Sequence, residues 1–586
     1  MKGSTPSHKP RRIIRKASHT TSKAVWQTFP LVHFLWPARN SVSQKIILPL
    51  ILIFVGLFRW AAGLWDYSGY KKPPKFGDYE AQRHWMEVTT QLPISQWYFY
   101  DLDWWGLDYP PLTAYHSWLL GKLGSIINNN WFALYTSRGS DDPDLKIFMR
   151  SSVILSEYLI YIPAVIFFVQ KLTTDQGIHN WNANIAVIAI LLQPATILID
   201  HVHFQFNNVM LGLVVASINC ILVGKLKWSC FLFVLALSFK QMALFYAPAI
   251  FAFLLGRSIN PKLNLRRFIG ISITTLASFA LILLPLILGA IYGAYNGIDV
   301  QPDIPYQLVS LPIFTEYSYL IDSHAWYYPI ILQFAQILHR IFPFARGLFE
   351  DKVANFWCAL NVVVKFRNFP LVLLQQASLL ATLAAVIPPC LVIFLKPKTA
   401  ALPLAFSTTA WSFFLFGFQV HEKSILLPLM PMTLLLAGSQ GMSEHMRAWI
   451  GLANVLGVWT MFPLLQRVNL RVPYFVLTGL WMYLLGLPTK LFCLNSKGRS
   501  QITMEDLTSI VHTLYYVLMG FWHLLEAFIP PPLSKPDLWT VINIEIGASG
   551  FFLCYLWCLW NQIKVCGFVN STGQKKLDKN FKRKLN

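Results

Sequence analysis

The chain has 586 residues, of which 55% are hydrophobic and only 13% are charged, and its mean hydropathy is +0.47. This composition excludes an ordinary soluble protein and indicates many membrane-spanning helices. The net charge is +21, but the basic residues gather at the termini and in short loops between apolar runs. That distribution is typical of cytosolic loops and argues against nucleic acid as a partner.

Residues 1–44 are basic and contain no acidic residue, so we expect a disordered cytosolic arm. The apolar run at about 45–65 is too long for a signal-peptide core and is predicted to remain as the first span. With the N-terminus held in the cytosol, the next loop, 66–146, is luminal. Further spans are predicted near 147–170, 183–199, 207–223, 267–293, 370–395, 401–418, 424–440, 446–465, 472–487, 508–529 and 538–562.

The apolar stretch 228–255 has Lys240 near its centre and basic residues beyond both ends. Both ends should therefore be cytosolic, and the stretch is predicted to go out and back as two short helices that meet at Lys240. A lysine within the membrane is costly unless it faces a polar cavity. The alternative is a lysine that extends to the membrane interface. Both interpretations place Lys240 near the luminal side.

The spans divide the chain into five parts: the basic arm 1–44, an N-terminal seven-span catalytic module 45–295, a second luminal loop 296–369, a C-terminal seven-span module 370–562, and a basic cytosolic tail 563–586. In the second loop, 326–342 is predicted to form an interfacial or re-entrant helix, with a further span as the alternative. The tail carries Lys582 and Lys584, which resemble a dilysine signal for return to the endoplasmic reticulum.

The first luminal loop contains the most informative motifs. It includes the run GDYEAQRHWME at 77–87. On a helix, Asp78, Gln82 and Trp85 share one face, while Arg83 and Glu87 can pair. A carboxylate, an amide and a large ring on one face suit a sugar. The alternative is that Asp78 only caps the helix.

The same loop also contains the run WGLDYPPLTAYHSWLLG at 105–121. Its Asp108 either belongs to the site or only supports the turn that the following Tyr-Pro-Pro imposes.

These two runs, with VHEKSILLPLMP at 420–431, closely resemble the dolichyl-phosphate-glucose-dependent α-1,3-glucosyltransferases of the endoplasmic reticulum membrane. The resemblance extends from about residue 45 to about 560 and is closest to the members that add the first glucose. It implies an all-α polytopic membrane protein of the GT-C glycosyltransferase type, with about fourteen transmembrane helices and helical luminal loops. It also implies inverting transfer of glucose from dolichyl-phosphate-glucose to dolichol-linked Man9GlcNAc2 at the lipid bilayer, without a metal or other cofactor.

The resemblance identifies Asp78 as the general base, with Asp108 as the runner-up. One base suffices because dolichyl phosphate leaves without a general acid. The departing phosphate needs positive charge or hydrogen-bond donors, and the resemblance marks an acidic pair and a histidine as functional. The residues predicted to bind substrate are Glu80, Gln82, Arg83, His84, Trp85, His201, His203, Lys240, Glu350, Asp351, His421 and Lys423.

Several alternatives remain open. Asp200, His201 and His203 resemble part of a metal site, although the ligand set is incomplete. The sister transferase would add a second glucose to Glc1Man9GlcNAc2. A lipid or solute transporter would account for the spans and for Lys240, but not for the acidic and aromatic residues of the luminal loops, and no inverted repeat is visible. No phosphate-binding glycine motif supports a nucleotide donor.

Overall fold

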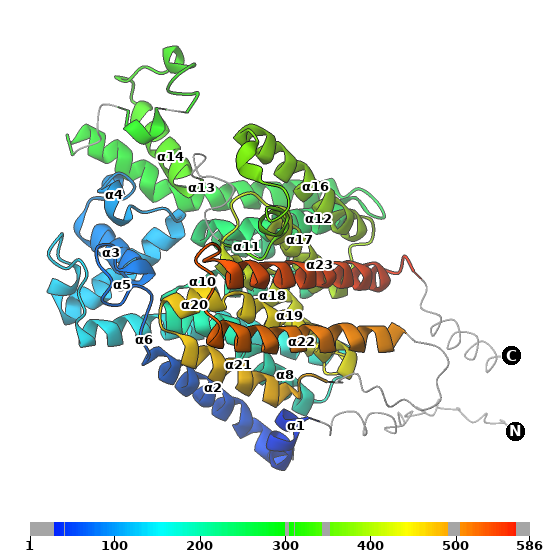
Figure 1. Cartoon of the computed structure of the whole chain (residues 1–586). Coiled ribbons are helices and arrows are strands. Elements are labelled where there is room, and N and C mark those ends of the chain that lie inside the picture. Colours follow the sequence, from blue (N-terminus) through cyan, green and yellow to red (C-terminus); the bar gives the residue numbers. More distant parts are fainter. Residues whose placement is uncertain are drawn as a thin grey trace, which may run out of the picture.

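The computed structural model describes residues 29–39, 41–298, 304–309, 311–342, 352–489 and 504–569. Within these ranges the chain is helical, with short 3-10 and π-helical segments and no strand, which confirms the all-α prediction. Long helices lie alongside one another, and a group of shorter helices covers one end of the bundle (Figure 1). We call this end the loop end; it is formed by α3 (Gly77–Gln91), α4 (Leu102–Trp105), α5 (Pro111–Ile127) and α14 (Tyr328–Ile341).

Nine segments of the described chain are long and apolar enough to cross a membrane, so the protein is multi-pass. They are built from α2 (Ser41–Gly63), α6 (Pro143–Leu159), α7 (Tyr161–Gln176), α8 (Asn180–Leu191), α12 (Ala247–Ile259), α13 (Leu265–Tyr295), α16 (Leu371–Leu395), α17 (Leu402–Phe416), α19 (Glu444–Thr460), α20 (Phe462–Arg467) and α23 (Leu538–Cys566). The other helices beside them are α10 (Asn207–Leu222), α11 (Leu226–Phe239), α18 (Leu426–Leu434), α21 (Arg471–Leu485) and α22 (Met504–Phe528). The total of fourteen spans stays a prediction.

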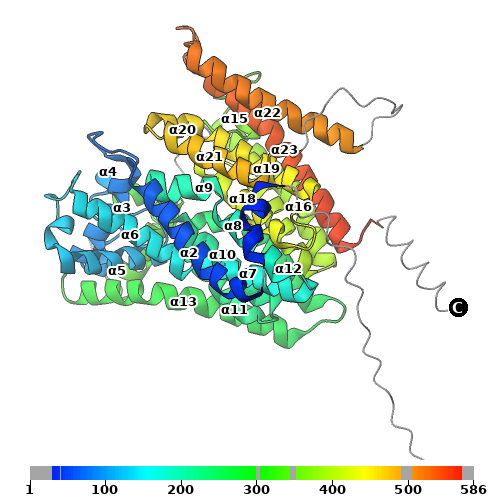
Figure 2. The same ribbon diagram turned by 90° about the horizontal axis from the view of Figure 1, so that it is seen from below.

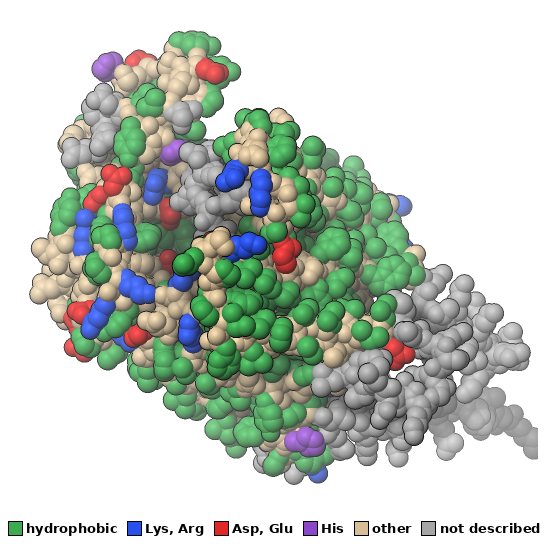
Figure 3. Space-filling view, viewed as in Figure 1, with side chains coloured by type: hydrophobic (Ala, Val, Ile, Leu, Met, Phe, Trp, Pro, Cys, Tyr) green, Lys and Arg blue, Asp and Glu red, His purple; other side chains and the backbone are tan. Residues whose placement is uncertain are grey.

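The outer surface of the bundle is apolar. Leu276 of α13 and Val517 of α22 are 70% and 59% exposed, and these two helices lie along opposite edges of the bundle (Figure 2). Hydrophobic side chains cover most of the face in Figure 3, whereas lysine, arginine and acidic side chains gather mainly toward the loop end. An apolar surface of this extent is expected to face lipid.

The loop end consists of α3 (Gly77–Gln91), α4 (Leu102–Trp105), α5 (Pro111–Ile127) and α14 (Tyr328–Ile341). α5 packs on α3, and α14 packs on α13. α14 is 14 residues long and is not among the nine segments of the described chain that can cross a membrane by length and composition, and its interfacial placement stays a prediction. α1 (Pro30–Leu35) and the last turn of α23 lie at the other end of the bundle (Figure 1), as expected if both termini are on one side.

Two interruptions of the spans position polar residues near the loop end. α8 continues through α9 (Pro194–Thr196) into η4, a π-helix at Ile197–Phe204. α11 ends just before Lys240, and η5 (Gln241–Tyr246) leads on to α12. The second loop region also contains the short helix α15 (Phe356–Leu360).

Candidate active site

Asp78 lies in the first turn of α3, where the backbone enters the helix in an uncommon conformation. Phe76 and Gly77 have φ values of +57° and +66°. A Cβ on Gly77 would lie 2.7 Å from the carbonyl oxygen of Ser68, so this position requires glycine. The N-cap residue of α3 is Phe76, and no side chain makes a capping hydrogen bond to the start of this helix. Asp78 is therefore not the helix cap, and the capping alternative is wrong.

The Asp78 carboxylate is held through one of its two oxygens. Oδ2 accepts a hydrogen bond of 2.8 Å from Gln205 Nε2 and pairs with the Lys423 ammonium. His203 Nδ1 lies 3.5 Å from the same oxygen. No described residue donates a hydrogen bond to Oδ1, and the side chain is 26% exposed. One oxygen is therefore fixed, while the other can receive a substrate hydroxyl.

The ionised form of Asp78 is stabilised by the residues around it. Burial by itself would raise the pKa of Asp78, because a buried carboxylate loses its hydration. The electrostatic effects of Lys423 and His203, with hydrogen bonds from Lys423 and Gln205, outweigh burial and hold the pKa of Asp78 well below its usual range. The carboxylate is therefore ionised at neutral pH and can accept a proton from a hydroxyl group.

Lys240 lies between α11 and η5, so the predicted break between two short helices is confirmed. Its ammonium donates to Asn207 Oδ1 at 2.6 Å and to Gln205 Oε1 at 3.5 Å, and it lies 4.8 Å from the centre of the Tyr109 ring. Lys240 is only 4% exposed, so it is held inside the fold and does not extend to an interface. Gln205 thus connects Lys240 with Asp78.

Asp108 lies in the turn between α4 and α5. Arg340 of α14 holds this turn by donating to the carbonyl oxygens of Gly106 and Leu107, at 2.8 and 3.1 Å. The Asp108 carboxylate is close enough to Lys240 to act on it electrostatically, as Asp78 also does. Both predicted carboxylates therefore lie around the same lysine.

Lys423 comes from the short helix η10 (Glu422–Ile425), which follows α17. The His421 ring caps this turn, because its Nδ1 accepts the backbone N–H of Lys423 at 3.1 Å. The His421 side chain is 43% exposed and the Lys423 side chain 12%. The third family motif is thereby joined to the first loop, across 345 positions of sequence between Asp78 and Lys423.

A second charged cluster on α3 contacts other protein groups. Arg83 lies 2.7 Å from Glu80 and 2.6 Å from Glu87, so the predicted Arg83–Glu87 pair is confirmed. Arg83 also donates to Ser137 Oγ at 2.6 Å, and His84 Nδ1 lies 3.2 Å from Glu87. The charged side chains of this cluster are at most 1% exposed. They join α3 to the segment after α5, and their predicted role in substrate binding stays a prediction.

Gln82 and Trp85 are each 3% exposed. The indole N–H of Trp85 donates to the carbonyl oxygen of Trp105 at 2.9 Å, and its ring lies 4.7 Å from that of Tyr109. Tyr109 in turn contacts Lys240. Trp85 therefore supports the site through Tyr109, and direct contact of Gln82 or Trp85 with a sugar stays a prediction.

The side chains of the Asp200-His201-x-His203 motif have different partners. Asp200 Oδ1 accepts from Asn207 Nδ2 at 2.8 Å, and His201 Nε2 lies 2.5 Å from Glu157 Oε2. His203 instead lies near the first-loop carboxylate. In the part of the chain that the structure describes, no group of three or more His, Cys, Asp and Glu side chains is placed to hold a metal ion. The motif therefore acts in three separate contacts.

Comparison with known proteins identifies the family of this chain. The sequence profile of the "ALG6, ALG8 glycosyltransferase family" matches residues 44–296 and 307–560. The chain belongs to this family. It is 42% identical over 551 residues to the probable dolichyl pyrophosphate Man9GlcNAc2 alpha-1,3-glucosyltransferase of Schizosaccharomyces pombe, covering 93% of this chain and 98% of the relative.

Two further relatives carry the name dolichyl pyrophosphate Man9GlcNAc2 alpha-1,3-glucosyltransferase. The protein of Saccharomyces cerevisiae is 42% identical over 549 residues, or 90% of this chain and 93% of the relative. The protein of Gallus gallus is 35% identical over 563 residues, or 91% of this chain and all of the relative. The similarity to these relatives therefore spans nearly the whole chain.

In this member of the ALG6, ALG8 family, sequence reasoning missed Gln205 and Asn207, although both contact the site. Their only signal is that they follow directly after an apolar span that ends in polar residues. Sequence reasoning also missed Arg59 and Glu157, although an ionisable residue within an apolar run is a pattern that indicates a functional position. The predicted Glu350 and Asp351 lie outside the described residues.

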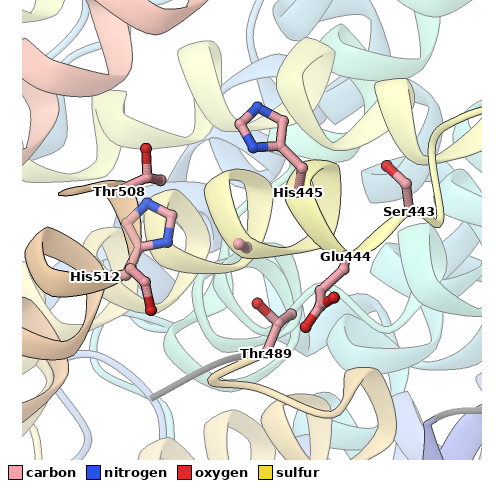
Figure 4. A pocket seen from close by; sticks show the side chains of 8 residues that line it. Ser443, Glu444, His445, Thr489, Thr508 and His512 are labelled. Atoms are coloured by element: carbon pink, nitrogen blue, oxygen red, sulfur yellow. The ribbon is translucent and has the colours of Figure 1, made fainter. Parts of the chain in front are cut away.

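A separate pocket of about 280 Å³ lies where the N-terminal ends of α19 and α22 meet. Its lining includes Glu444 and His445 from α19 and His512 from α22 (Figure 4). α18 begins just after Lys423 and leads toward α19, so the pocket lies beyond the far end of α18. None of the predicted site residues lines it. Asp78 instead contacts Gln205 and Lys423, so its surroundings are the candidate active site.

Proposed function

We propose that this chain transfers glucose from dolichyl-phosphate-glucose to dolichol-linked Man9GlcNAc2 and forms an α-1,3 linkage. The names of relatives that match about nine-tenths of the chain support the acceptor and the linkage. The observation that carries the proposal is the Asp78 carboxylate, whose Oδ2 is held by Gln205 and Lys423, while no described residue donates to Oδ1. Such a carboxylate is suited to remove a proton from a sugar hydroxyl.

Asp78 acts as the general base. Its Oδ1 accepts the proton of the acceptor mannose hydroxyl while that hydroxyl oxygen bonds to the anomeric carbon of glucose. The bond from this carbon to the donor phosphate breaks in the same displacement, so the configuration inverts. A positioned base contributes roughly 10²–10⁴-fold to the rate, and dolichyl phosphate leaves as an anion without a general acid.

The leaving phosphate requires fixed positive charge. Lys423 and Lys240 supply it close to Asp78, and His421 lies beside Lys423. Lys423 has a double role in this scheme, because its ammonium also contacts the base. A donor phosphate that draws this ammonium toward itself leaves Asp78 with a stronger affinity for a proton as the acceptor arrives.

We place the enzyme in the endoplasmic reticulum membrane with the loop end in the lumen and both termini in the cytosol. The basic arm, the Lys582 and Lys584 tail, and the position of α1 and the end of α23 away from the loop end support this orientation.

A transfer assay tests the proposed function. Purified protein is given dolichyl-phosphate-glucose and lipid-linked Man9GlcNAc2, with and without EDTA, and product is measured by mass spectrometry. We expect one glucose to be added at a rate that EDTA does not change. Transfer only to Glc1Man9GlcNAc2 would instead identify the sister activity, and a rate abolished by EDTA would contradict the metal-independent scheme.

Exchange of Lys423 for methionine is expected to change the pH dependence of transfer. Lys423 opposes the effect of burial on Asp78, so its loss raises the pKa of Asp78. Because only the ionised carboxylate is a base, the rate of Lys423→Met should fall toward acid at a higher pH than that of the wild type. The measurement is kcat/KM for the acceptor across the acid to neutral range.

The matched control is Lys423→Arg, which keeps the positive charge. It should retain the wild-type shape of the pH profile, whatever its absolute rate. Identical profiles for wild type and Lys423→Met would show that Lys423 does not set the charge state of the base.

A further inference from the structure

A buried ion pair lies inside the membrane-spanning part of the protein. Arg59 of α2 contacts both oxygens of Glu157 of α6, with its Nε 2.7 Å from Oε2 and one terminal nitrogen 2.8 Å from Oε1. Both side chains are 0% exposed, and both residues belong to segments that can cross a membrane. Ionisable side chains at such depth are costly and commonly have a functional role. Neither residue contacts Asp78 directly.

The same ion pair is joined to the π-helix η4. His201 Nε2 lies 2.5 Å from Glu157 Oε2, the oxygen that Arg59 Nε also contacts. Arg150, two turns before Glu157 on α6, donates to the carbonyl oxygen of His201 and, at 2.9 Å, to that of Val202. α2, α6 and η4 pack against one another. Two side chains of α6 therefore hold consecutive residues of η4.

The backbone of η4 requires such support. A π-helix is a rare arrangement that occurs frequently at functional sites, and Phe204 at its end has a φ of +87°. A bulky residue with positive φ is strained and persists only when its surroundings hold it. At this end, the backbone N–H of Ser68 donates to the carbonyl oxygen of His203 at 3.1 Å. The strain is therefore located between His203 and Gln205, the two η4-region residues that contact Asp78.

We propose that Glu157 is a positioning residue for the transfer reaction; this inference rests on the function proposed above. Glu157 anchors His201 and so maintains the π-helical register that brings His203 and Gln205 to Oδ2 of Asp78. Relaxation of η4 toward α-helical hydrogen bonding would rotate both residues about the helix axis. Asp78 would then keep only Lys423 as a donor among the described residues, and its open oxygen would no longer be fixed in direction.

The proposal separates positioning from stability. A single change at Glu157 leaves the Arg59 charge buried without its partner, which destabilises the fold. The pair is therefore changed together, as Arg59→Met with Glu157→Met, because apolar residues of similar volume commonly replace a buried ion pair without loss of stability. This double variant, called the Met pair below, keeps the packing and removes the carboxylate that anchors the His201 side chain, while Arg150 still donates to the His201 carbonyl oxygen. We expect its kcat to fall by about 10²-fold, as for a small misplacement of a catalytic group, with KM for donor and acceptor near the wild-type values.

The decisive measurement is a mutant cycle with His203→Ala/Gln205→Ala, which lacks both contacts that Glu157 is proposed to position. If Glu157 acts through these contacts, the Arg59→Met/Glu157→Met change (the Met pair) lowers kcat of the wild-type protein. The same change causes no further loss of kcat in the protein that already carries His203→Ala and Gln205→Ala. Equal fold losses in both backgrounds would overturn the positioning role. Gln562→Met is the control, since Gln562 is fully buried and donates to Pro389 between α23 and α16. It should leave kcat unchanged in both backgrounds.

Hydrogen exchange tests whether Glu157 anchors η4, and it does so without an activity measurement. The Met pair should increase exchange of backbone amides in the segment 197–206, whereas Gln562→Met should not. Unchanged exchange in the Met pair overturns the proposal. A wild-type protein that transfers no glucose overturns the proposed function instead, and the exchange comparison then still tests whether Glu157 holds η4.

Discussion

Replacing Asp78 with asparagine is expected to abolish glucose transfer while the protein remains folded. The amide is nearly the same size and can still accept hydrogen bonds from Gln205 and Lys423, but it cannot take up the proton of the acceptor hydroxyl. The expected loss in kcat is roughly 10²–10⁴-fold. The measurement is single-turnover transfer by purified wild type and variant, together with binding of the donor, which should be retained.

Asp108→Asn is the matched control, because Asp108, like Asp78, is a predicted site carboxylate that acts electrostatically on Lys240. We expect this variant to keep most of its transfer rate. Full activity of Asp78→Asn combined with an inactive Asp108→Asn would reverse the two roles. Loss of activity in both would indicate that the carboxylates act together around Lys240.

The spans could be predicted from the sequence because their signal is local. Apolar runs with basic ends predicted α13 at 267–293, and the structure has Leu265–Tyr295. The same reasoning found the break at Lys240, because a lysine within an apolar run requires polar partners. It could not name those partners, since Asn207 is 33 positions away and no periodicity connects the two residues.

The site was less predictable because its contacts are distant in sequence. Helical spacing correctly paired Arg83 with Glu87, but spacing does not determine what a helix face meets. Arg83 meets Ser137, from a segment 54 positions later, and Asp78 meets Gln205, 127 positions later. Only the packing of α3 against these segments decides which of its polar residues faces a solvent-accessible site and which is enclosed.

α3 therefore uses its charges in two ways. Near its start, Asp78 is partly exposed and keeps one oxygen open. On another face of the same helix, Glu80 and Glu87 are enclosed and both bind Arg83. Burial would raise the pKa of Glu87, but His84 and Arg83 lower it to about 2, so Glu87 is ionised and depends on these partners.

Exchange of Arg83 for methionine is expected to destabilise the protein strongly. It leaves the buried carboxylates of Glu80 and Glu87 without their arginine, and breaking a buried pair in this way costs about 3–5 kcal/mol. The measurement is thermal unfolding of the purified protein in detergent. Arg138→Met is the control from the same region, because the Arg138–Asp101 pair is 20% and 25% exposed and should contribute at most about 1 kcal/mol.

The same variant tests whether Arg83 binds substrate, as the sequence predicts. If its role is to hold α3, Arg83→Met lowers the unfolding temperature, and the folded fraction keeps the wild-type KM for donor and acceptor. Adding Glu80→Gln and Glu87→Gln should then recover part of the stability, since neutral amides need no buried cation. If Arg83 binds substrate instead, the unfolding temperature stays near that of Arg138→Met while KM rises. A rise in KM that Glu80→Gln and Glu87→Gln do not reverse would show that Arg83 binds substrate.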